Sequence, residues 1–342
     1  MQAVLINRYG NAQSVFKTSE VDKPTIKPDE VLVGIKASSV NPIECKMRSG
    51  YGRKIFTKKR GFEFPVILGN DVCGVIEAVG SKVTEFKIGD EVFTAPEVTG
   101  QGSYCEYRAI KAKYCVTKPS NLSFEEAATI PYVALTTWAS LVTKAKLGPD
   151  NSRGKRVLVH GGSGGIGSFA IQLLKAWGAE VITTCSTAKV EKVKALGADL
   201  VIDYCQQDFT TIIDNCDVVF DTVGDDVEQK SLRVLKKNGK SYYVTLVFPA
   251  LANIDQSGIF RGAIQSISAF LGKKKTFKKQ GVNYGWGMFK SNKEALTVVK
   301  DLIEEGKIKP AVGKTFPLVQ LADAHTYAES GKGFGKIAIA IS

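Results

Sequence analysis

The spacing of apolar positions changes near residue 123, and this change divides the chain into two regions. Before it, short β-rich apolar runs alternate with turn signals such as Lys27-Pro28-Asp29. The strands expected there are Ala3–Ile6, Glu30–Ala37, Val72–Val79, Glu91–Thr94, Tyr104–Ala109 and Cys115–Lys118. This pattern predicts a small β-rich domain of barrel or sandwich type over residues 1–124.

The second region opens with Ser123-Phe124-Glu125-Glu126, which fits a capping box at the start of a helix. Helical and strand-like runs then alternate. The expected strands are Val157–Val159, Val181–Cys185, Leu200–Tyr204, Val218–Thr222 and Ser241–Leu246, and the helices are Leu135–Leu147, Val190–Leu196, Phe209–Asp214 and Val227–Leu235. Such alternation is typical of α/β proteins of the Rossmann type, in which helices cover a doubly wound parallel sheet.

The remainder of the chain is less regular. Residues 247–290 mix apolar, glycine and lysine residues without a clean period, so no element is predicted there. Lys293–Glu305 has the apolar spacing of an amphipathic helix, and Gly335–Ser342 alternates as a strand does. We therefore expect residues 125–310 to form the Rossmann domain.

A glycine cluster follows the apolar run Val157-Leu158-Val159 and precedes a helical run. Gly162, Gly164 and Gly167 have the G-x-G-x-x-G spacing of a dinucleotide site. The first glycine is expected to allow the tight turn, the second the approach of a pyrophosphate, and the third close packing of helix on strand. The phosphate-binding residues predicted from this loop are Gly162, Ser163, Gly164, Gly165, Ile166 and Gly167.

The end of the next strand indicates which dinucleotide binds. NAD sites carry an acidic residue about 20 residues beyond the glycines, which holds the ribose 2′-hydroxyl. Here that position falls within Thr183–Thr187, which holds no acid, and Lys189 follows. The hydroxyl of Ser186 and the ammonium of Lys189 can bind a 2′-phosphate. The sequence thus predicts NADPH rather than NADH as the cofactor.

The charge balance adds a question about partners. With 46 Lys and Arg against 34 Asp and Glu, the net charge is +12, and positive residues gather at Arg53–Arg60 and Lys273–Lys279. Solvated loops are the ordinary explanation, steering of an anionic cofactor is a second, and nucleic-acid binding a third. Because no RNA-binding motif accompanies the charge, a nucleic-acid partner is not expected.

Other features limit the location and the chemistry. No apolar run approaches the roughly 20 residues of a membrane helix, so no membrane partner is expected. The start, MQAVLINRYG, is strand-like, which favours a cytoplasmic protein. The seven cysteines form no C-x-x-C pair, and His160 and His325 are the only histidines, which argues against a metal site. His160, which ends a strand, is expected to be structural.

Several motifs occur in a fixed order along the whole chain. They are Asn41-Pro42 with Glu44 and Arg48, Pro65-x-x-x-Gly69-x-Asp71-x-x-Gly74, Gly89-Asp90-Glu91-Val92, Gly102-Ser103-Tyr104, and the glycine loop. In these motifs the chain resembles the zinc-free quinone oxidoreductase branch of the medium-chain dehydrogenase/reductase family. The resemblance implies a GroES-like domain over 1–124, completed by 311–342, and a homodimer. Gly69-Asn70-Asp71 replaces the Gly-His-Glu that carries a zinc ligand in other branches.

The resemblance also implies roles for single residues. Asn41 is expected in the cleft, orienting the substrate or the nicotinamide carboxamide. Tyr51 is expected in the quinone pocket, donating a hydrogen bond or a proton to a developing oxyanion, with loop packing as an equal alternative. Thr136 and Leu246 are expected beside the nicotinamide, and Tyr204 at the 2′-phosphate. Phe334 stands where relatives have a basic residue.

These observations predict an NADPH-dependent, zinc-independent enzyme that reduces quinones or α,β-unsaturated carbonyls by direct hydride transfer. The alternative is an NADPH-binding sensor or interaction protein with little turnover, a class that includes RNA-binding proteins.

Overall fold

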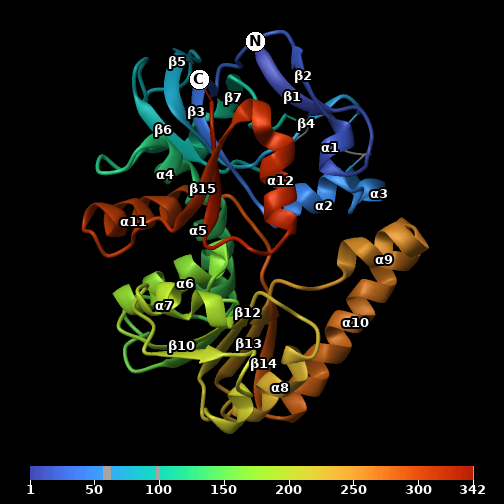
Figure 1. Cartoon of the computed structure of the whole chain (residues 1–342), viewed down its shortest axis with the longest axis vertical. Helices are drawn as coiled ribbons and strands as arrows, with labels where there is room; N and C mark the ends of the chain where they lie inside the picture. Colours follow the sequence, from blue (N-terminus) through green and yellow to red (C-terminus); the bar gives the residue numbers. More distant parts are fainter. Residues whose placement is uncertain (57–62, 98–100, 342) are drawn as a thin grey trace.

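The computed structural model describes residues 1–56, 63–97 and 101–341. Lys58, Lys59 and Arg60 of the expected basic run lie outside these ranges. Within them, the chain forms two lobes, each built around its own sheet (Figure 1).

The upper lobe in Figure 1 holds a seven-stranded, mostly antiparallel sheet. Its path runs through β15 (Val312–Pro317), β16 (Lys336–Ala340), β3 (Glu30–Val40), β5 (Val72–Val79), β6 (Glu91–Thr94) and β8 (Val116–Thr117), and β7 (Tyr107–Lys111) also pairs with β3. A smaller sheet consists of β1 (Gln2–Ile6), β2 (Phe16–Glu20) and β4 (Val66–Ile67). The C-terminal strand β16 pairs antiparallel with β3, so the two ends of the chain build one lobe.

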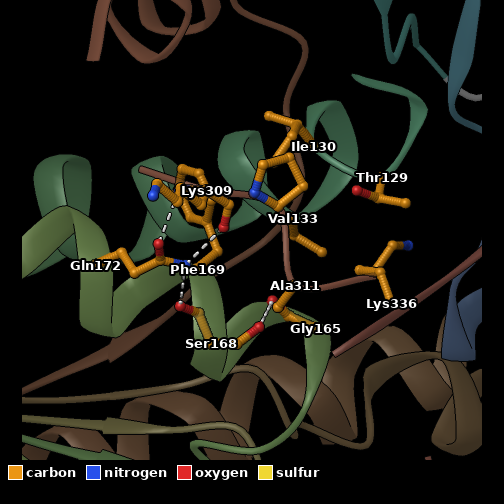
Figure 2. A pocket seen from close by; sticks show the side chains of 11 residues that line it. Thr129, Ile130, Val133, Gly165, Ser168, Phe169, Gln172, Lys309, Ala311 and Lys336 are labelled. Carbon is orange, nitrogen blue, oxygen red and sulfur yellow. Dashed lines mark hydrogen bonds between the residues drawn. The ribbon is translucent and has the colours of Figure 1, made fainter. Parts of the chain in front are cut away.

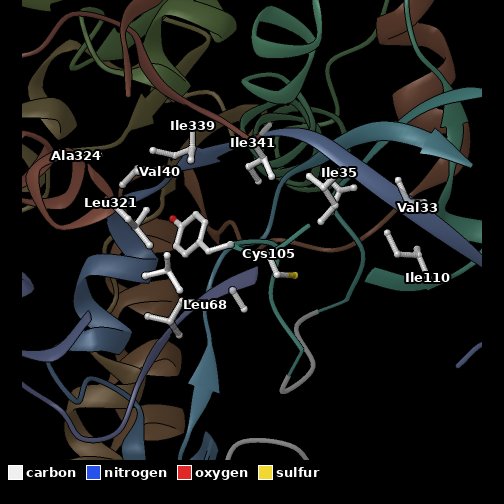
Figure 3. Packing of buried hydrophobic residues seen from close by; sticks show 14 of the residues in the cluster. Val33, Ile35, Val40, Leu68, Cys105, Ile110, Leu321, Ala324, Ile339 and Ile341 are labelled. Carbon is white, nitrogen blue, oxygen red and sulfur yellow. The ribbon is translucent and has the colours of Figure 1, made fainter. Parts of the chain in front are cut away.

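One core lies under these strands. It joins residues that are far apart in the sequence, among them Val40, Cys105, Leu321 and Ile339 (Figure 3). The helices of this lobe are α1 (Ala12–Val15), α2 (Pro42–Arg48), α3 (Arg53–Phe56), α4 (Phe124–Ala128) and α12 (Leu321–Glu329). Burial of this shared apolar surface ties the C-terminal segment to the N-terminal region.

The lower lobe holds a six-stranded sheet in which the neighbouring strands are all parallel. Its order is β11 (Leu200–Asp203), β10 (Glu180–Cys185), β9 (Arg156–His160), β12 (Val218–Asp221), β13 (Ser241–Thr245) and β14 (Val282–Trp286). The helices around it are α5 (Pro131–Trp138), α6 (Gly165–Ala176), α7 (Val190–Lys194), α8 (Val227–Val234), α9 (Ala250–Ser257), α10 (Ile259–Lys279) and α11 (Lys293–Glu304). The order reverses at β9, which confirms the predicted doubly wound α/β sheet.

Several elements differ from the prediction. The helix expected over Leu135–Leu147 is α5 followed by a π-helical stretch at Ala139–Lys144. The segment Phe209–Asp214 contains only a 3-10 turn. The unassigned residues 247–290 contain α9, α10 and β14. The domain boundaries at residues 124 and 311 stay a prediction. In the described ranges, every helix is too short or too polar to cross a lipid bilayer.

Candidate active site

The glycine loop joins β9 to α6. The left-handed conformation that its turn needs falls at Gly161, with φ of +77°, one residue before the predicted position. Gly162 serves a different purpose, because a Cβ there would lie 2.1 Å from the Thr183 hydroxyl of β10. A Cβ at Gly167 would lie 2.2 Å from the carbonyl oxygen of Gly161, so α6 approaches the loop as closely as expected.

The start of α6 has the properties of a phosphate site. Gly164 caps the helix and is exposed, and a Cβ there would come no nearer to another atom than 3.5 Å. The first N–H groups of a helix have no partner within it and carry partial positive charge. Ser163 ties the loop to the C-terminal segment, because its carbonyl accepts from the amide of Gly335 at 2.8 Å. The loop therefore fits a pyrophosphate.

His160, the last residue of β9, is buried beneath this loop. One of its ring nitrogens lies 3.1 Å from the Thr184 hydroxyl and the other 3.0 Å from the Ser231 hydroxyl. Burial lowers its pKa to about 4. With both nitrogens engaged and the ring neutral, His160 has a structural role.

The ends of β10 and β11 bring together the residues predicted for the 2′-phosphate. Ser186 and Lys189 follow β10, and Tyr204, which is 61% exposed, follows β11. The backbone amide of Tyr204 donates to the carbonyl of Cys185 at 3.1 Å, which keeps the two strand ends adjacent. The Lys189 ammonium donates to the carbonyl of Gly331 at 2.9 Å.

A hollow of about 380 Å³ opens beside Lys189, between the two lobes. Lys189, Lys192 and Lys332 line it together with the rings of Tyr327 and Phe334, and none of the described lining residues is acidic. The hollow is therefore positively charged, although Phe334 stands where the resemblance led us to expect a basic residue. Lys192 and Lys332 were missed by the sequence analysis because they lie on different lobes and gather only in the fold.

Asn41 lies in a buried polar cluster of the upper lobe, where it caps α2. Its side-chain amide donates to Glu44 at 3.1 Å and to Asp71 at 2.9 Å, and its oxygen accepts from Lys336 at 2.5 Å. With 1% exposure, the side chain is committed to protein partners. Its predicted contact with substrate or nicotinamide stays a prediction, and the role that the geometry supports is to order this cluster.

Lys336 supplies the cation of the cluster. Its ammonium donates to the Val40 carbonyl at 3.0 Å and lies 3.6 Å from a carboxylate oxygen of Asp71. Burial lowers the pKa of Lys336, which the charges of Asp71 and Glu44 oppose. Burial raises the pKa of Glu44 to about 7, which Lys336 opposes. The cluster balances buried charges on both sides.

The replaced zinc motif takes part in the same cluster. Asn70 donates to Glu44 at 2.6 Å, and Asp71 accepts from the backbone amide of Tyr132 at 2.7 Å. The turn Gly69-Asn70-Asp71 therefore contacts the Tyr132 amide and the Lys336 ammonium, and its own Asn70 amide binds Glu44. In the described part of the chain, no group of three or more His, Cys, Asp and Glu side chains is arranged to hold a metal ion.

The two lobes meet tightly at the first turn of α6. The aliphatic chain of Lys336 lies against Gly165, since a Cβ there would be 2.6 Å from the lysine Cδ. A cavity of only about 10 Å³ remains between them, room for about one water (Figure 2). Beside it, Gln172 of α6 exchanges two hydrogen bonds with the backbone of Lys309 (Figure 2). The loop is therefore packed against the upper lobe at Gly165, while Gly164 stays exposed.

Tyr51 lies in the loop after α2 and is partly buried. Burial and the charge of Asp255 raise its pKa. Asp255 of α9 accepts hydrogen bonds from the backbone amides of Gly52 and Lys54 at 2.5 and 3.1 Å. The Tyr51 loop of the upper lobe is therefore attached to the lower lobe.

The residues predicted beside the nicotinamide occupy the lower lobe. Leu246 directly follows β13, so it lies at the same strand-end edge as the glycine loop and Ser186. Thr136 lies in α5, one turn after Val133, which would be 3.5 Å from a Cβ at Gly165. The Thr136 hydroxyl is buried and has no described partner in hydrogen-bonding geometry.

Comparisons with known proteins agree with this arrangement. Residues 27–120 match the alcohol dehydrogenase GroES-like domain, and residues 196–339 match a family described as zinc-binding dehydrogenase. The chain is 38% identical to the NAD(P)H oxidoreductase RTN4IP1, mitochondrial, of Danio rerio, over 100% of this chain and 91% of that protein. It is 34% identical to the NADPH-dependent alkenal/one oxidoreductase, chloroplastic, of Arabidopsis thaliana, over 99% and 79%.

The fold is shared with the crystal structure of Escherichia coli quinone oxidoreductase complexed with NADPH, with a TM-score of 0.78, 25% identity, and coverage of 99% and 100%. The chain therefore belongs to the medium-chain dehydrogenase/reductase family, a family of NAD(P)H oxidoreductases, and to its quinone oxidoreductase branch. A likeness to the Nogo-interacting members of that branch is predicted from the runs Arg48–Gly52, Pro131–Thr136, Lys175–Trp177 and Tyr243–Val247, and the RTN4IP1 match confirms it.

One expectation is corrected by these relatives. The expected cytoplasmic location is contradicted, because the relatives in Danio rerio, Bos taurus, Mus musculus and Homo sapiens are all named as mitochondrial proteins. The strand-like first residues carried that expectation and are not informative about location.

Proposed function

We propose that the chain is an NADPH-dependent, zinc-independent reductase of quinones or α,β-unsaturated carbonyls. The observation that carries the cofactor choice is the basic hollow at the end of β10, where three lysines gather and none of the described lining residues is acidic. A carboxylate there would repel a 2′-phosphate, whereas ammonium groups bind it by charge-assisted hydrogen bonds. The names of the relatives supply the substrate classes, quinones and alkenals or enones.

The chain's own residues would hold the cofactor in two places. The amides at the start of α6 would bind the pyrophosphate, with exposed Gly164 leaving room for it. Ser186, Lys189 and Lys332 would bind the 2′-phosphate, with Tyr204 beside them. Bound NADPH would supply a hydride, which is the redox chemistry of the reaction.

The substrate side needs an apolar surface and a hydrogen-bond donor. Val247 and Met288 follow β13 and β14 at the strand-end edge and are 42% and 55% exposed, which provides apolar surface for a quinone ring or an enone. Because its pKa is raised, the Tyr51 phenol keeps its proton at neutral pH. It would donate a hydrogen bond to the substrate oxygen on which negative charge develops.

The test compares dinucleotides by calorimetry and by steady-state oxidation with phenanthrenequinone or an alkyl vinyl ketone. Lys189→Gln and Lys332→Gln are each expected to weaken NADPH and adenosine 2′,5′-bisphosphate binding about tenfold or more, and to leave NADH binding unchanged. Lys87→Gln, at an exposed lysine of the upper lobe, is the matched control.

Two results would contradict the proposal. Equal affinity for NADH and NADPH would remove the cofactor assignment. Tight NADPH binding without turnover of either substrate class would instead support a sensor or interaction protein.

A further inference from the structure

The helix α10 carries a row of apolar side chains that face solvent. Phe260, Ile264, Ile267 and Leu271 are 86%, 68%, 60% and 57% exposed. Their spacing of four, three and four residues places them on one face of the helix. The opposite face is the one that packs on the protein, through Gly262, Ser266 and Phe277 among others. We refer to the four exposed side chains as the apolar row.

This helix lies at the periphery of the lower lobe. It packs against α9 and β14, and its outer side faces away from both lobes (Figure 1). Soluble proteins rarely expose contiguous apolar surface of this kind unless it is a binding surface. The apolar row is therefore expected to bind a partner, and the charge of α10 indicates the chemistry of that partner.

The C-terminal third of α10 is strongly basic. Lysines occupy positions 273, 274, 275, 278 and 279, Arg261 adds a further charge, and α10 contains no acidic residue. Lys273 pairs with Glu228 of α8. At 100° per residue, Lys274, Lys275 and Lys278 lie on the same side of the helix as the apolar row. The row and these lysines thus form one continuous surface.

We propose that α10 docks on an anionic lipid bilayer, lying along its surface without crossing it. The apolar row enters the boundary between headgroups and acyl chains, and the lysines meet negatively charged headgroups. A second copy packed parallel to this helix would bring like charges together, and an antiparallel one would place the lysines on the apolar row, so pairing through this face is disfavoured. A large apolar side chain at each of four successive positions on one face, followed by lysines on that face, is the pattern of an interfacial helix.

The experiment is vesicle flotation with the full chain, and it needs no turnover. Vesicles of phosphatidylcholine alone are compared with vesicles of phosphatidylcholine mixed with phosphatidylserine. Wild-type protein is expected to float with the mixed vesicles and to bind the neutral ones at least tenfold more weakly. Ile264→Ser combined with Ile267→Ser is expected to lower binding to the mixed vesicles at least tenfold.

The lysines are tested separately. Lys274→Gln, Lys275→Gln and Lys278→Gln together are expected to lower binding about 100-fold, roughly fivefold for each charge. The matched controls are Ile88→Ser with Val319→Ser, which are 68% and 74% exposed on the upper lobe. The control for net charge is a triple variant at exposed positions of the upper lobe, Lys17→Gln with Lys36→Gln and Lys87→Gln. Because the substituted side chains are exposed, circular dichroism and the melting temperature should stay unchanged.

Three outcomes would overturn the proposal. The first is failure of the wild type to float with the mixed vesicles. The second is binding that depends on the lysines while the serine variant binds as the wild type does, because the helix would then not enter the bilayer. The third is a lipid-independent dimer that the serine variant dissociates, which would make the row an interface between copies.

Discussion

Lys336 places a buried cation in the polar cluster of the upper lobe. In this chain the turn Gly69-Asn70-Asp71 and Asn41 surround an ammonium, which compensates the two buried carboxyl groups of the cluster. Removing a cation from such a cluster leaves uncompensated buried charge, which is strongly destabilising. Hydrogen bonds and the buried Lys336 cation therefore order this part of the upper lobe.

His325 supplies a prediction about pH. It is fully buried, and its two ring nitrogens lie 3.4 Å from the Cys45 sulfur and 3.3 Å from the Tyr104 hydroxyl. Burial, and to a lesser degree the charge of Arg48, lower its pKa to about 3 from an ordinary 6.5. The unfolded chain therefore binds a proton at mildly acid pH that the folded chain does not. The stability that neutral His325 provides is present above about pH 6.5 and is lost as pH falls toward 3.

We expect the free energy of unfolding of the wild type to fall by about 2 kcal/mol between about pH 7 and about pH 5 on account of His325. In His325→Gln this part of the fall should disappear. Urea titrations of both proteins at the two pH values measure it, and the difference between them cancels the opposite contribution of Glu44. An identical pH slope in the two proteins would show that the ring titrates normally when folded.

At the scale of elements, the glycine loop depends on contacts of glycine with backbone. Gly167→Ala would place a Cβ 2.2 Å from the Gly161 carbonyl oxygen, so α6 would have to move from the loop. We expect a loss of about 1 to 3 kcal/mol in the free energy of unfolding and weaker NADPH binding. Gly272→Ala in α10, where no atom lies within 4 Å, is the control and should stabilise by about 0.5 to 1 kcal/mol. Equal effects of the two substitutions on denaturant unfolding would refute the packing argument.

The elements that could be predicted from the sequence were those with a regular apolar spacing or a continuous apolar run between turn signals. The strands β5 and β6 match their predicted bounds, because each is a β-rich apolar run beside clear turn signals. The helix α10 could not be predicted, since its apolar row faces solvent while Gly262 and Ser266 face the protein. That arrangement reverses the usual relation between polarity and burial.

The same contrast applies to the site. The phosphate loop is local in sequence, so its spacing was enough to predict it. The positive φ at Gly161 instead of Gly162 was not visible, because a run of glycines does not show which one occupies the turn. The basic hollow and the cluster around Lys336 consist of residues brought together by long-range strand pairing, which no local spacing records.

For the molecule as a whole, the two lobes are joined at two separate places by different means. At the first, Gly165 and Lys336 pack closely. At the second, α9 holds the Tyr51 loop through the carboxylate of Asp255, which accepts from two backbone amides. The second connection includes the partly exposed side chain of Asp255, whose two hydrogen bonds a single substitution can remove.

Asp255→Ala is therefore expected to free the Tyr51 loop and lower kcat/KM for a quinone about tenfold, because a hydrogen-bond acceptor with charge is lost from two amides. NADPH affinity should not change, since the glycine loop and the basic hollow lie on other elements. Asp208→Ala is the matched control, because Asp208 also accepts from a backbone amide, that of Thr210, but within one lobe. Steady-state kinetics and calorimetry on both variants measure these two quantities. A parallel loss of NADPH affinity in Asp255→Ala would mean that Asp255 supports the fold of the lower lobe and does not act on the Tyr51 loop alone.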